Sequence, residues 1–231
     1  MRKNVYAAHD FIRQGKFKTP EKMIAVEKLL ETKRVVINWW CRQSGKTLTS
    51  IKIGRDIMVN TPGSVVLFVC PKMSICNSVT EKMARTIDRS LIKSTDATGL
   101  ILKNGSIFKA GPLRNNMSLD PVIDKVDLLV IDEFEWMEET TMASLLLIIR
   151  QHIWPSMMQR FLRMFKEKKH TRVIMNSSKN DGKNFSMIKS SLPEIGITYF
   201  NWEKIPSLNR EALIEKLGEE SFEKEYNSYN P

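Results

Sequence analysis

The sequence predicts an α/β protein with a mostly parallel central sheet that helices cover on both faces. Two observations lead to this fold class. Short apolar runs, each long enough for one buried strand, alternate along the 231 residues with segments of helical periodicity. Polar motifs follow two of these runs: Gly-Lys-Thr comes after the first, and Asp-Glu ends a later one. Because ligands bind where parallel strands end, both motifs are expected at the carboxyl edge of the sheet.

Each expected element is bounded by residues that start or stop regular structure. Thr19 and Pro20 suit the cap and first turn of a helix. Pro71 ends the second buried run, and the pair Asn104-Gly105 between two short apolar runs predicts a hairpin with a type I′ turn. In chain order the expected elements are helix 19–32, strand 34–38, helix 45–59, strand 64–70, helix 74–90, hairpin 100–109, strand 126–131, helices 138–150 and 155–168, strands 171–176 and 197–202, and helices 209–217 and 220–229.

Length and composition indicate one domain. Residues 1–33 are expected to form a helical lead-in, residues 34–202 the core and residues 203–231 a C-terminal helical segment. The formal net charge of +10 favours a polyanionic partner. Because no apolar run approaches the length of a membrane span and no apolar signal core follows the N-terminus, neither membrane insertion nor export is expected. The three cysteines lack metal-ligand spacing and are expected to remain reduced, chiefly as small apolar groups.

A phosphate-binding loop is predicted after the first strand. A strand that feeds a tight loop and then a helix points backbone N–H groups at one spot, where the helix dipole also favours an anion. Gly45 allows the close approach of phosphate, Lys46 reaches the β and γ oxygens, and the Thr47 hydroxyl ligates Mg²⁺. The expected nucleotide-binding residues of the loop are Gln43, Ser44, Gly45, Lys46 and Thr47. The usual motif has a further Gly five positions before Gly45, where this chain has Trp40.

Two carboxylates, Asp132 and Glu133, end the apolar run of the third buried strand. Asp132 is expected to complete the Mg²⁺ shell with Thr47, and Glu133 to polarise the water that attacks the γ-phosphate. ATP with Mg²⁺ is therefore the expected ligand. The alternative interpretation, two solvated acids at a helix N-terminus, leaves their pairing with the phosphate loop unexplained.

Several other residues have both a functional and a plain structural interpretation. Arg42, in the middle of the loop, is expected to contact the γ-phosphate as a catalytic cation; the alternative is a surface Arg. Ser177 and Ser178 follow a strand beside the site and are either γ-phosphate sensors or a strand-to-loop cap. Arg114 is a candidate arginine finger for a neighbouring subunit's ATP, or a solvated loop residue. The basic residues between 160 and 172 predict either contact with DNA phosphates or a solvated helix face.

The order of these motifs resembles the ATPase half of the large terminase subunit, the DNA-packaging motor of tailed phages and herpesviruses. The resemblance rests on segments 41–47, 69–71, 104–106, 132–134, 176–185 and 200–226. It implies a three-layer P-loop NTPase of the ASCE/RecA-like class that hydrolyses Mg-ATP to move double-stranded DNA into a procapsid. One departure concerns adenine recognition: the family often has a Gln in the helix before the phosphate loop, where this chain has Lys22 and Met23.

The resemblance also implies partners and a place of action. The expected partners are double-stranded DNA, the portal protein, the small terminase subunit and a nuclease domain or subunit. A chain that is monomeric in isolation would form a homo-oligomeric ring on the portal, in the host cell cytoplasm. Members of the family continue into an RNase H-like nuclease, and this chain ends where that domain would begin, so no nuclease activity is expected of it.

Two other functions fit parts of the sequence. The first alternative is a helicase-like or other nucleic-acid-stimulated P-loop ATPase, although the chain is short for the two RecA-like domains that helicases carry. The second is a nucleotide-binding scaffold that does not hydrolyse ATP. The presence of Lys46, Thr47, Asp132 and Glu133 argues against the scaffold, because these residues supply the chemistry of hydrolysis.

Overall fold

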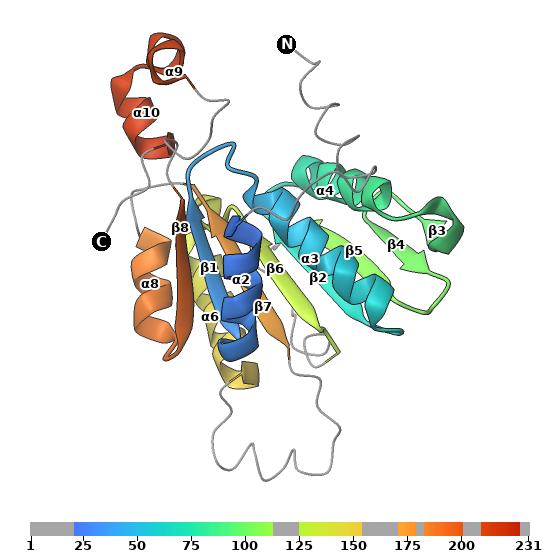
Figure 1. The fold of residues 1–231 in the computed structure, drawn as a ribbon. Coiled ribbons are helices and arrows are strands. Elements are labelled where there is room, and N and C mark those ends of the chain that lie inside the picture. Colours follow the sequence, from blue (N-terminus) through green and yellow to red (C-terminus); the bar gives the residue numbers. More distant parts are fainter. Residues whose placement is uncertain (1–20, 113–124, 154–170, 179–182, 201–208, 227–231) are drawn as a thin grey trace.

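The fold is a single eight-stranded sheet with helices on both faces (Figure 1). The computed structural model describes residues 21–112, 125–153, 171–178, 183–200 and 209–226. The strands are β1 (Val35–Trp40), β2 (Val65–Cys70), β3 (Ile92–Thr95), β4 (Gly99–Leu102), β5 (Ile107–Pro112), β6 (Leu128–Asp132), β7 (Arg172–Ser177) and β8 (Ile195–Phe200). The α-helices are α2 (Glu21–Thr32), α3 (Lys46–Asn60), α4 (Met73–Thr86), α6 (Glu139–Ile153), α8 (Lys183–Ser191), α9 (Arg210–Leu217) and α10 (Glu219–Tyr226), and two 3₁₀ turns are η1 (Arg89–Leu91) and η2 (Phe134–Trp136).

The strand order is β3-β4-β5-β2-β6-β7-β1-β8. All neighbouring pairs from β5 to β8 are parallel, whereas β3, β4 and β5 pair antiparallel at one edge. The predicted mostly parallel α/β architecture is therefore confirmed. Strand β7 lies between β1, which leads into Gly-Lys-Thr, and β6, which carries Asp132. This order places the two motifs on strands that a single strand separates.

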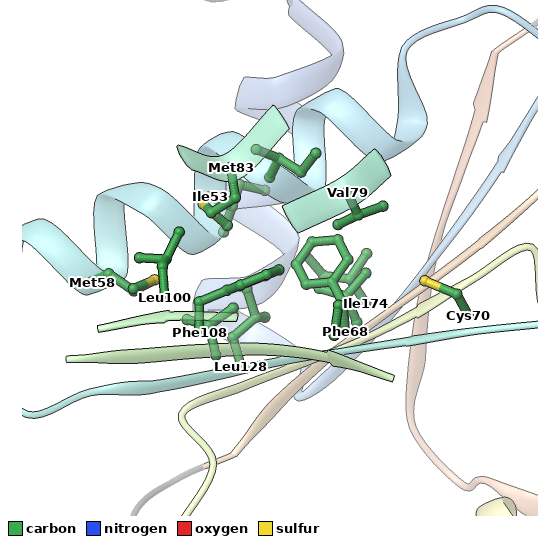
Figure 2. Close-up of a cluster of buried hydrophobic side chains, with 14 of the residues drawn as sticks. Ile53, Met58, Phe68, Cys70, Val79, Met83, Leu100, Phe108, Leu128 and Ile174 are labelled. Carbon is green, nitrogen blue, oxygen red and sulfur yellow. The ribbon is translucent and has the colours of Figure 1, made fainter. Parts of the chain in front are cut away.

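Two apolar layers hold the helices to the sheet. One layer packs α2, α3 and α4 against one face, where Phe68 and Phe108 from neighbouring strands meet Ile53, Val79 and Met83 from the helices (Figure 2). The other layer packs α6 and α8 against the opposite face. Strands β1 and β6 are buried along their whole length, which explains why their sequences are continuous apolar runs rather than alternating ones.

The C-terminal helices α9 and α10 form a smaller unit of their own. Phe222 and Tyr226 of α10 are buried together with Cys41, the first residue after β1. The two rings stack with centroids 5.5 Å apart and planes at 4°. This third cluster joins the end of the described chain to the loop that follows β1. Cys41, Cys70 and Cys76 are all buried free thiols, in agreement with their expected packing role.

The structure corrects several local predictions. The turn between β4 and β5 is not type I′, because Asn104 does not adopt a positive φ, whereas Gly105 does, at 85°. The amide of Gly105 donates to the carbonyl of Leu102, so Lys103 and Asn104 are the central residues and Gly105 follows them in the left-handed region, as in a three-residue hairpin loop. The helix expected at 74–90 ends at Thr86, and two extended residues separate it from η1; β1 runs two residues past its expected end.

Three elements were not predicted at all: the short edge strand β3, the 3₁₀ turn η2 and the helix α8. The expected helix at 155–168 and the expected cap at Thr19 and Pro20 lie outside the described residues. Among the helices that the structure describes, none combines the length and apolar character needed to cross a bilayer.

Candidate nucleotide-binding site

The loop between β1 and α3 is shaped by residues in the left-handed region of backbone space. Gly45, directly before α3, has φ 90° and ψ 19°, which suits a residue without a β-carbon. Gln43 also has a positive φ, 61°, which is uncommon for a residue with a side chain. Arg42 and Gln43 are exposed at the loop, whereas Ser44 is buried. The loop thus turns tightly from a buried strand into the first turn of a helix.

Lys46 is a buried cation at the start of α3. Its side chain is 5% exposed, and Nζ donates to the backbone carbonyls of Trp40 at 3.1 Å and Cys41 at 3.3 Å. Burial lowers the pKa of Lys46, and the carboxylates of Glu133 and Asp132 act against this change. A phosphate group bound at the loop would place a further negative charge beside the Lys46 ammonium group and so stabilise its charged form.

Thr47 and Asp132 lie side by side, one on α3 and the other at the end of β6. The Thr47 hydroxyl is 3.2 Å from Oδ1 and 3.0 Å from Oδ2 of Asp132. Burial raises the pKa of Asp132, while hydrogen bonds from Asn176 and Thr47 oppose the rise. A hydroxyl and a carboxylate are oxygen ligands of the kind that Mg²⁺ takes, together with phosphate oxygens and waters. In the described part of the chain no group of three or more His, Cys, Asp or Glu residues is arranged to hold a metal ion.

Glu133 follows Asp132 with a strained backbone, at φ 54° and ψ 48°. Ser178 donates a long hydrogen bond of 3.4 Å to its carboxylate. Burial raises the pKa of Glu133, and the charges of Lys46 and Arg42 act against that rise. Arg42 is exposed, but it is close enough for its charge to influence the pKa of both Lys46 and Glu133. A carboxylate with a raised pKa is suited to accept a proton from water.

The structure therefore brings together the loop residues, Asp132, Glu133 and Ser178. Ser177 is buried at the end of β7. Because Asn176 beside it bonds to Ser50 of α3, strand alternation directs Ser177 to the opposite face of the sheet. Arg114 lies outside the described residues, as do the basic residues between 160 and 170, while Arg172 is exposed at the start of β7.

A reciprocal set of hydrogen bonds, not foreseen from the sequence, holds η2 to α8. The carboxylate of Glu135 accepts from the backbone amides of Asn184 at 3.3 Å and Phe185 at 2.8 Å. In return, the side-chain amide of Asn184 donates to the carbonyls of Phe134 at 2.9 Å and Met137 at 3.0 Å. These contacts, here called the η2–α8 clamp, fix the turn that immediately follows Glu133. Asp, Glu and Asn side chains commonly satisfy free backbone groups in this way, but their partners here lie about 50 residues away in sequence.

Three polar residues inside the sheet were also missed. Asn38, Asn176 and Thr198 occupy matching positions on β1, β7 and β8. A signal was present for two of them in the sequence, because Asn38 interrupts the apolar run of β1 and Asn176 ends the apolar run of β7. A buried amide needs hydrogen-bond partners, so such an interruption points to a polar network.

Comparison with known proteins identifies the fold. No protein-family model and no curated protein sequence matches the chain. Solved structures do match. A mutant of the large terminase ATPase domain of Thermus phage P74-26 superposes with a TM-score of 0.55 at 15% identity, over 94% of this chain and 96% of that one. The large terminase of a thermophilic bacteriophage, in complex with ADP, gives a TM-score of 0.61 at 13% identity, over 90% of this chain.

A third match is the large terminase of bacteriophage HK97, with a TM-score of 0.53 at 15% identity over 83% of this chain. This chain spans 53% of the ADP-bound terminase and 40% of the HK97 protein. At these identities the comparison concerns architecture: the chain has the P-loop NTPase fold of large-terminase ATPase domains.

Proposed function

We propose that this protein is the ATPase motor of a viral DNA-packaging machine, which hydrolyses Mg-ATP to move double-stranded DNA into a procapsid. One observation carries the proposal: Lys46, the pair Thr47–Asp132 and the pair Glu133–Ser178 converge at the carboxyl edge of a parallel sheet. The shared fold with large-terminase ATPase domains supports the choice of this function over other uses of ATP.

The proposed roles follow the chemistry of each group. Lys46 and the backbone amides of residues 43–47 bind the phosphates. Thr47 and Asp132 would hold Mg²⁺, which would neutralise charge on the phosphates. Glu133 orients a water molecule for attack and accepts its proton, and Arg42 places a positive charge near the γ-phosphate. Ser178 holds the Glu133 carboxylate and senses the γ-phosphate, whereas Ser177, which faces the other side of the sheet, is not proposed as part of this sensor.

The remaining parts of the proposal concern assembly. Subunits form a homo-oligomeric ring on the portal in the host cell, with the small terminase subunit and a nuclease domain or subunit as further partners. The net charge of +10 suits association with the DNA backbone. Arg114 is proposed as an arginine finger that acts on the ATP of the adjacent subunit, which would make an isolated monomer a slow ATPase.

Replacement of Lys46 tests the site. In Lys46→Ala, Mg-ATP binding should weaken and phosphate release should fall to background, because the buried cation that faces the phosphates is lost. Lys28→Ala is the matched control, since Lys28 is exposed on α2. Isothermal titration with Mg-ATP and steady-state phosphate release would be measured for both variants. Wild-type turnover in Lys46→Ala would show that this loop does not hold the nucleotide.

A second measurement separates packaging from other DNA-dependent ATPases. ATP turnover of the wild-type protein would be compared alone, with double-stranded DNA, and with portal-bearing procapsids and DNA together. A packaging motor should respond most to the complete assembly and protect the DNA from nuclease digestion. Full stimulation by naked nucleic acid, with no protected DNA, would favour the helicase-like alternative.

A further inference from the structure

A row of polar side chains crosses four adjacent parallel strands at the edge of the sheet that holds the candidate site. Thr198 on β8 is in register with Asn38 on β1, Asn38 with Asn176 on β7, and Asn176 with Asp132 on β6. Asn38, Asn176 and Asp132 are each at most 2% exposed. Polar groups this deeply buried require partners, and here they find them in one another.

The hydrogen bonds of this row form an unbroken chain. The indole Nε1 of Trp40 donates to the hydroxyl of Thr198 at 2.8 Å, and that hydroxyl donates to Oδ1 of Asn38 at 2.8 Å. The amide nitrogen of Asn38 donates to Oδ1 of Asn176 at 2.9 Å. The amide nitrogen of Asn176 donates in turn to Oδ1 of Asp132 at 2.9 Å. We call these five residues the polar row.

The residues at the two ends of the polar row determine which group donates and which accepts in each of its hydrogen bonds. An indole N–H is a donor and never an acceptor, whereas an ionised carboxylate is an acceptor and never a donor. Since Trp40 donates to Thr198, the Thr198 hydroxyl has its proton available for Asn38. A reversed amide at Asn38 or Asn176 would place two donors or two acceptors opposite each other. Each amide therefore has one orientation that satisfies the whole row.

Two residues of α3 also bond to the polar row. The amide nitrogen of Asn176 also donates to the hydroxyl of Ser50 at 2.9 Å, so both of its protons are used. The Asp132 carboxylate is thus held by Asn176 from the sheet and by Thr47 from α3. Groups that bond to a metal-binding side chain in this way set its orientation and influence its affinity for the ion.

We propose that Trp40 and Thr198 are positioning residues for the metal-binding carboxylate: through Asn38 and Asn176 they hold Asp132 in the orientation that binds Mg²⁺. This inference rests on the proposed function of the same site. Trp40 has a second connection, because its backbone carbonyl accepts from Lys46 Nζ. The residue that stands in place of the usual Gly of the phosphate loop is therefore bonded directly to Lys46, and it is linked to Asp132 through the polar row.

The first test measures metal affinity without ATP turnover. Thr198→Val removes the hydroxyl at nearly constant shape, Thr198→Ser retains it, and Thr80→Val is the matched control, because Thr80 is buried in α4 and donates to the carbonyl of Cys76. Mn²⁺ binding in the presence of a non-hydrolysable ATP analogue would be followed by electron paramagnetic resonance. We expect roughly tenfold weaker Mn²⁺ binding in Thr198→Val, as for other groups that support a metal ligand, and wild-type binding in the other two variants. Equal Mn²⁺ affinity in Thr198→Val and wild type would overturn the inference.

The second test uses the ligand-free protein, so it does not depend on nucleotide binding. The side-chain amide resonances of Asn38 and Asn176 would be recorded in ¹⁵N-labelled wild type, Thr198→Val and Trp40→Phe. Trp39→Phe is the control, since Trp39 packs on the opposite face of the sheet against Phe185. We expect the Asn176 resonances to move in both row variants, although neither altered side chain bonds to Asn176.

The two tests separate two kinds of failure. If the wild-type protein bound no Mn²⁺ with nucleotide, the proposed function would be wrong, and the amide resonances would still decide whether the polar row is coupled. Unchanged Asn176 resonances in both Trp40→Phe and Thr198→Val would show that the row does not transmit orientation, whatever the site binds. If Thr198→Val did not fold, Trp40→Phe would carry both measurements, because its ring still fills the core.

Discussion

At the scale of single residues, three charged groups lie close together at the end of the sheet, Lys46 and Asp132 buried and Glu133 half-buried. Lys46, Asp132 and Glu133 each lose hydration on folding, and burial shifts the pKa of each toward its neutral form. Their mutual attraction offsets part of this cost, as the influence of the carboxylates on the Lys46 pKa shows. Removing these three charges from water costs free energy, and a bound nucleotide and metal ion would offset part of that cost by pairing with them.

Replacement of Glu133 tests two things together: the energetic cost of burying its charge and its proposed role as general base. In Glu133→Gln, Mg-ATP binding should persist, while turnover should fall by about 10²–10⁴-fold, the usual contribution of a positioned proton acceptor. The ligand-free variant should also be more stable than wild type at about pH 8, because a buried carboxylate has been removed. Phosphate release and urea denaturation would measure the two effects.

The sign of the stability effect follows from the direction of the pKa shift. The pKa of Glu133 is raised in the folded state, so the native protein holds this proton more tightly than the unfolded chain. Glu133 therefore costs no stability below its unfolded pKa of 4.5, and the cost grows until the pH exceeds the folded pKa. The advantage of Glu133→Gln should be small at about pH 4.5 and largest at about pH 8. The exposed Glu138→Gln is the control, and an equal advantage at both pH values would contradict the argument.

At the scale of elements, the η2–α8 clamp links the proposed catalytic strand end to the segment that follows β7. Glu133 adopts a left-handed conformation, which typically costs a residue with a side chain about 1–3 kcal/mol and so requires support from its surroundings. Glu135 and Asn184 supply that support on the side of α8, and Ser178 on the side of β7. A change in the segment between β7 and α8 is therefore expected to reach Glu133.

Removal of the Asn184 side chain should uncouple this support. Asn184→Ala leaves the carbonyls of Phe134 and Met137 without their donor, which should destabilise the protein by about 1–3 kcal/mol. We expect kcat to fall roughly ten- to a hundredfold, because small displacements of a catalytic group have effects of this size, while the KM for ATP stays near that of wild type.

The control for this variant is Ser186→Ala, an exposed change on the same helix. Steady-state kinetics and urea denaturation would be measured for both proteins. A loss of stability in Asn184→Ala with unchanged kcat would show that the clamp serves folding alone.

At the scale of the whole molecule, the end of the described chain packs on the loop between β1 and α3. Cys41 is fully buried between that loop and the aromatic residues of α10. Arg210 lies over the Phe222 ring at 5.4 Å and within 3.4 Å of Glu219. An exposed ion pair such as Arg210–Glu219 contributes little to stability. Apolar burial at Phe222 and Tyr226 is therefore expected to hold α9 and α10 in place.

Phe222→Ala tests whether the loop that contains Cys41 depends on its packing against α10. The loss of a fully buried ring typically costs about 3–5 kcal/mol, and here it also removes the cover of Cys41. We expect weaker Mg-ATP binding, because the backbone of the phosphate loop becomes less ordered. Glu211→Ala, an exposed change on α9, is the control. Calorimetric titration of both variants would check the prediction, and it fails if Phe222→Ala binds Mg-ATP as tightly as wild type.

Local patterns were sufficient for most of the architecture. Buried strands of a parallel sheet are continuous apolar runs, so β1, β2, β6, β7 and β8 were all predicted, within a few residues at their ends. Gly45, Lys46 and Thr47 could be recognised as a motif because they are consecutive in the sequence. Asp132 and Glu133 could be recognised at the end of β6 because they, too, are consecutive and directly follow an apolar run. The assignment of these residues to ATP stays a prediction. Helix α8 was missed because it has only nine residues and its first backbone amides are satisfied by Glu135, which is distant in sequence.

The sequence by itself therefore determined the fold class and the side chains at the candidate site, because those signals are contained in segments of a few residues. The tertiary structure alone decided which side chains support them. Thr198, Asn38 and Asn176 face one another only after β8, β1 and β7 have aligned in a particular order and register. A shift of one residue in any of these strands would turn its polar group to the other face of the sheet. Register depends on the packing of the whole sheet, so no single segment of the chain contains the polar row.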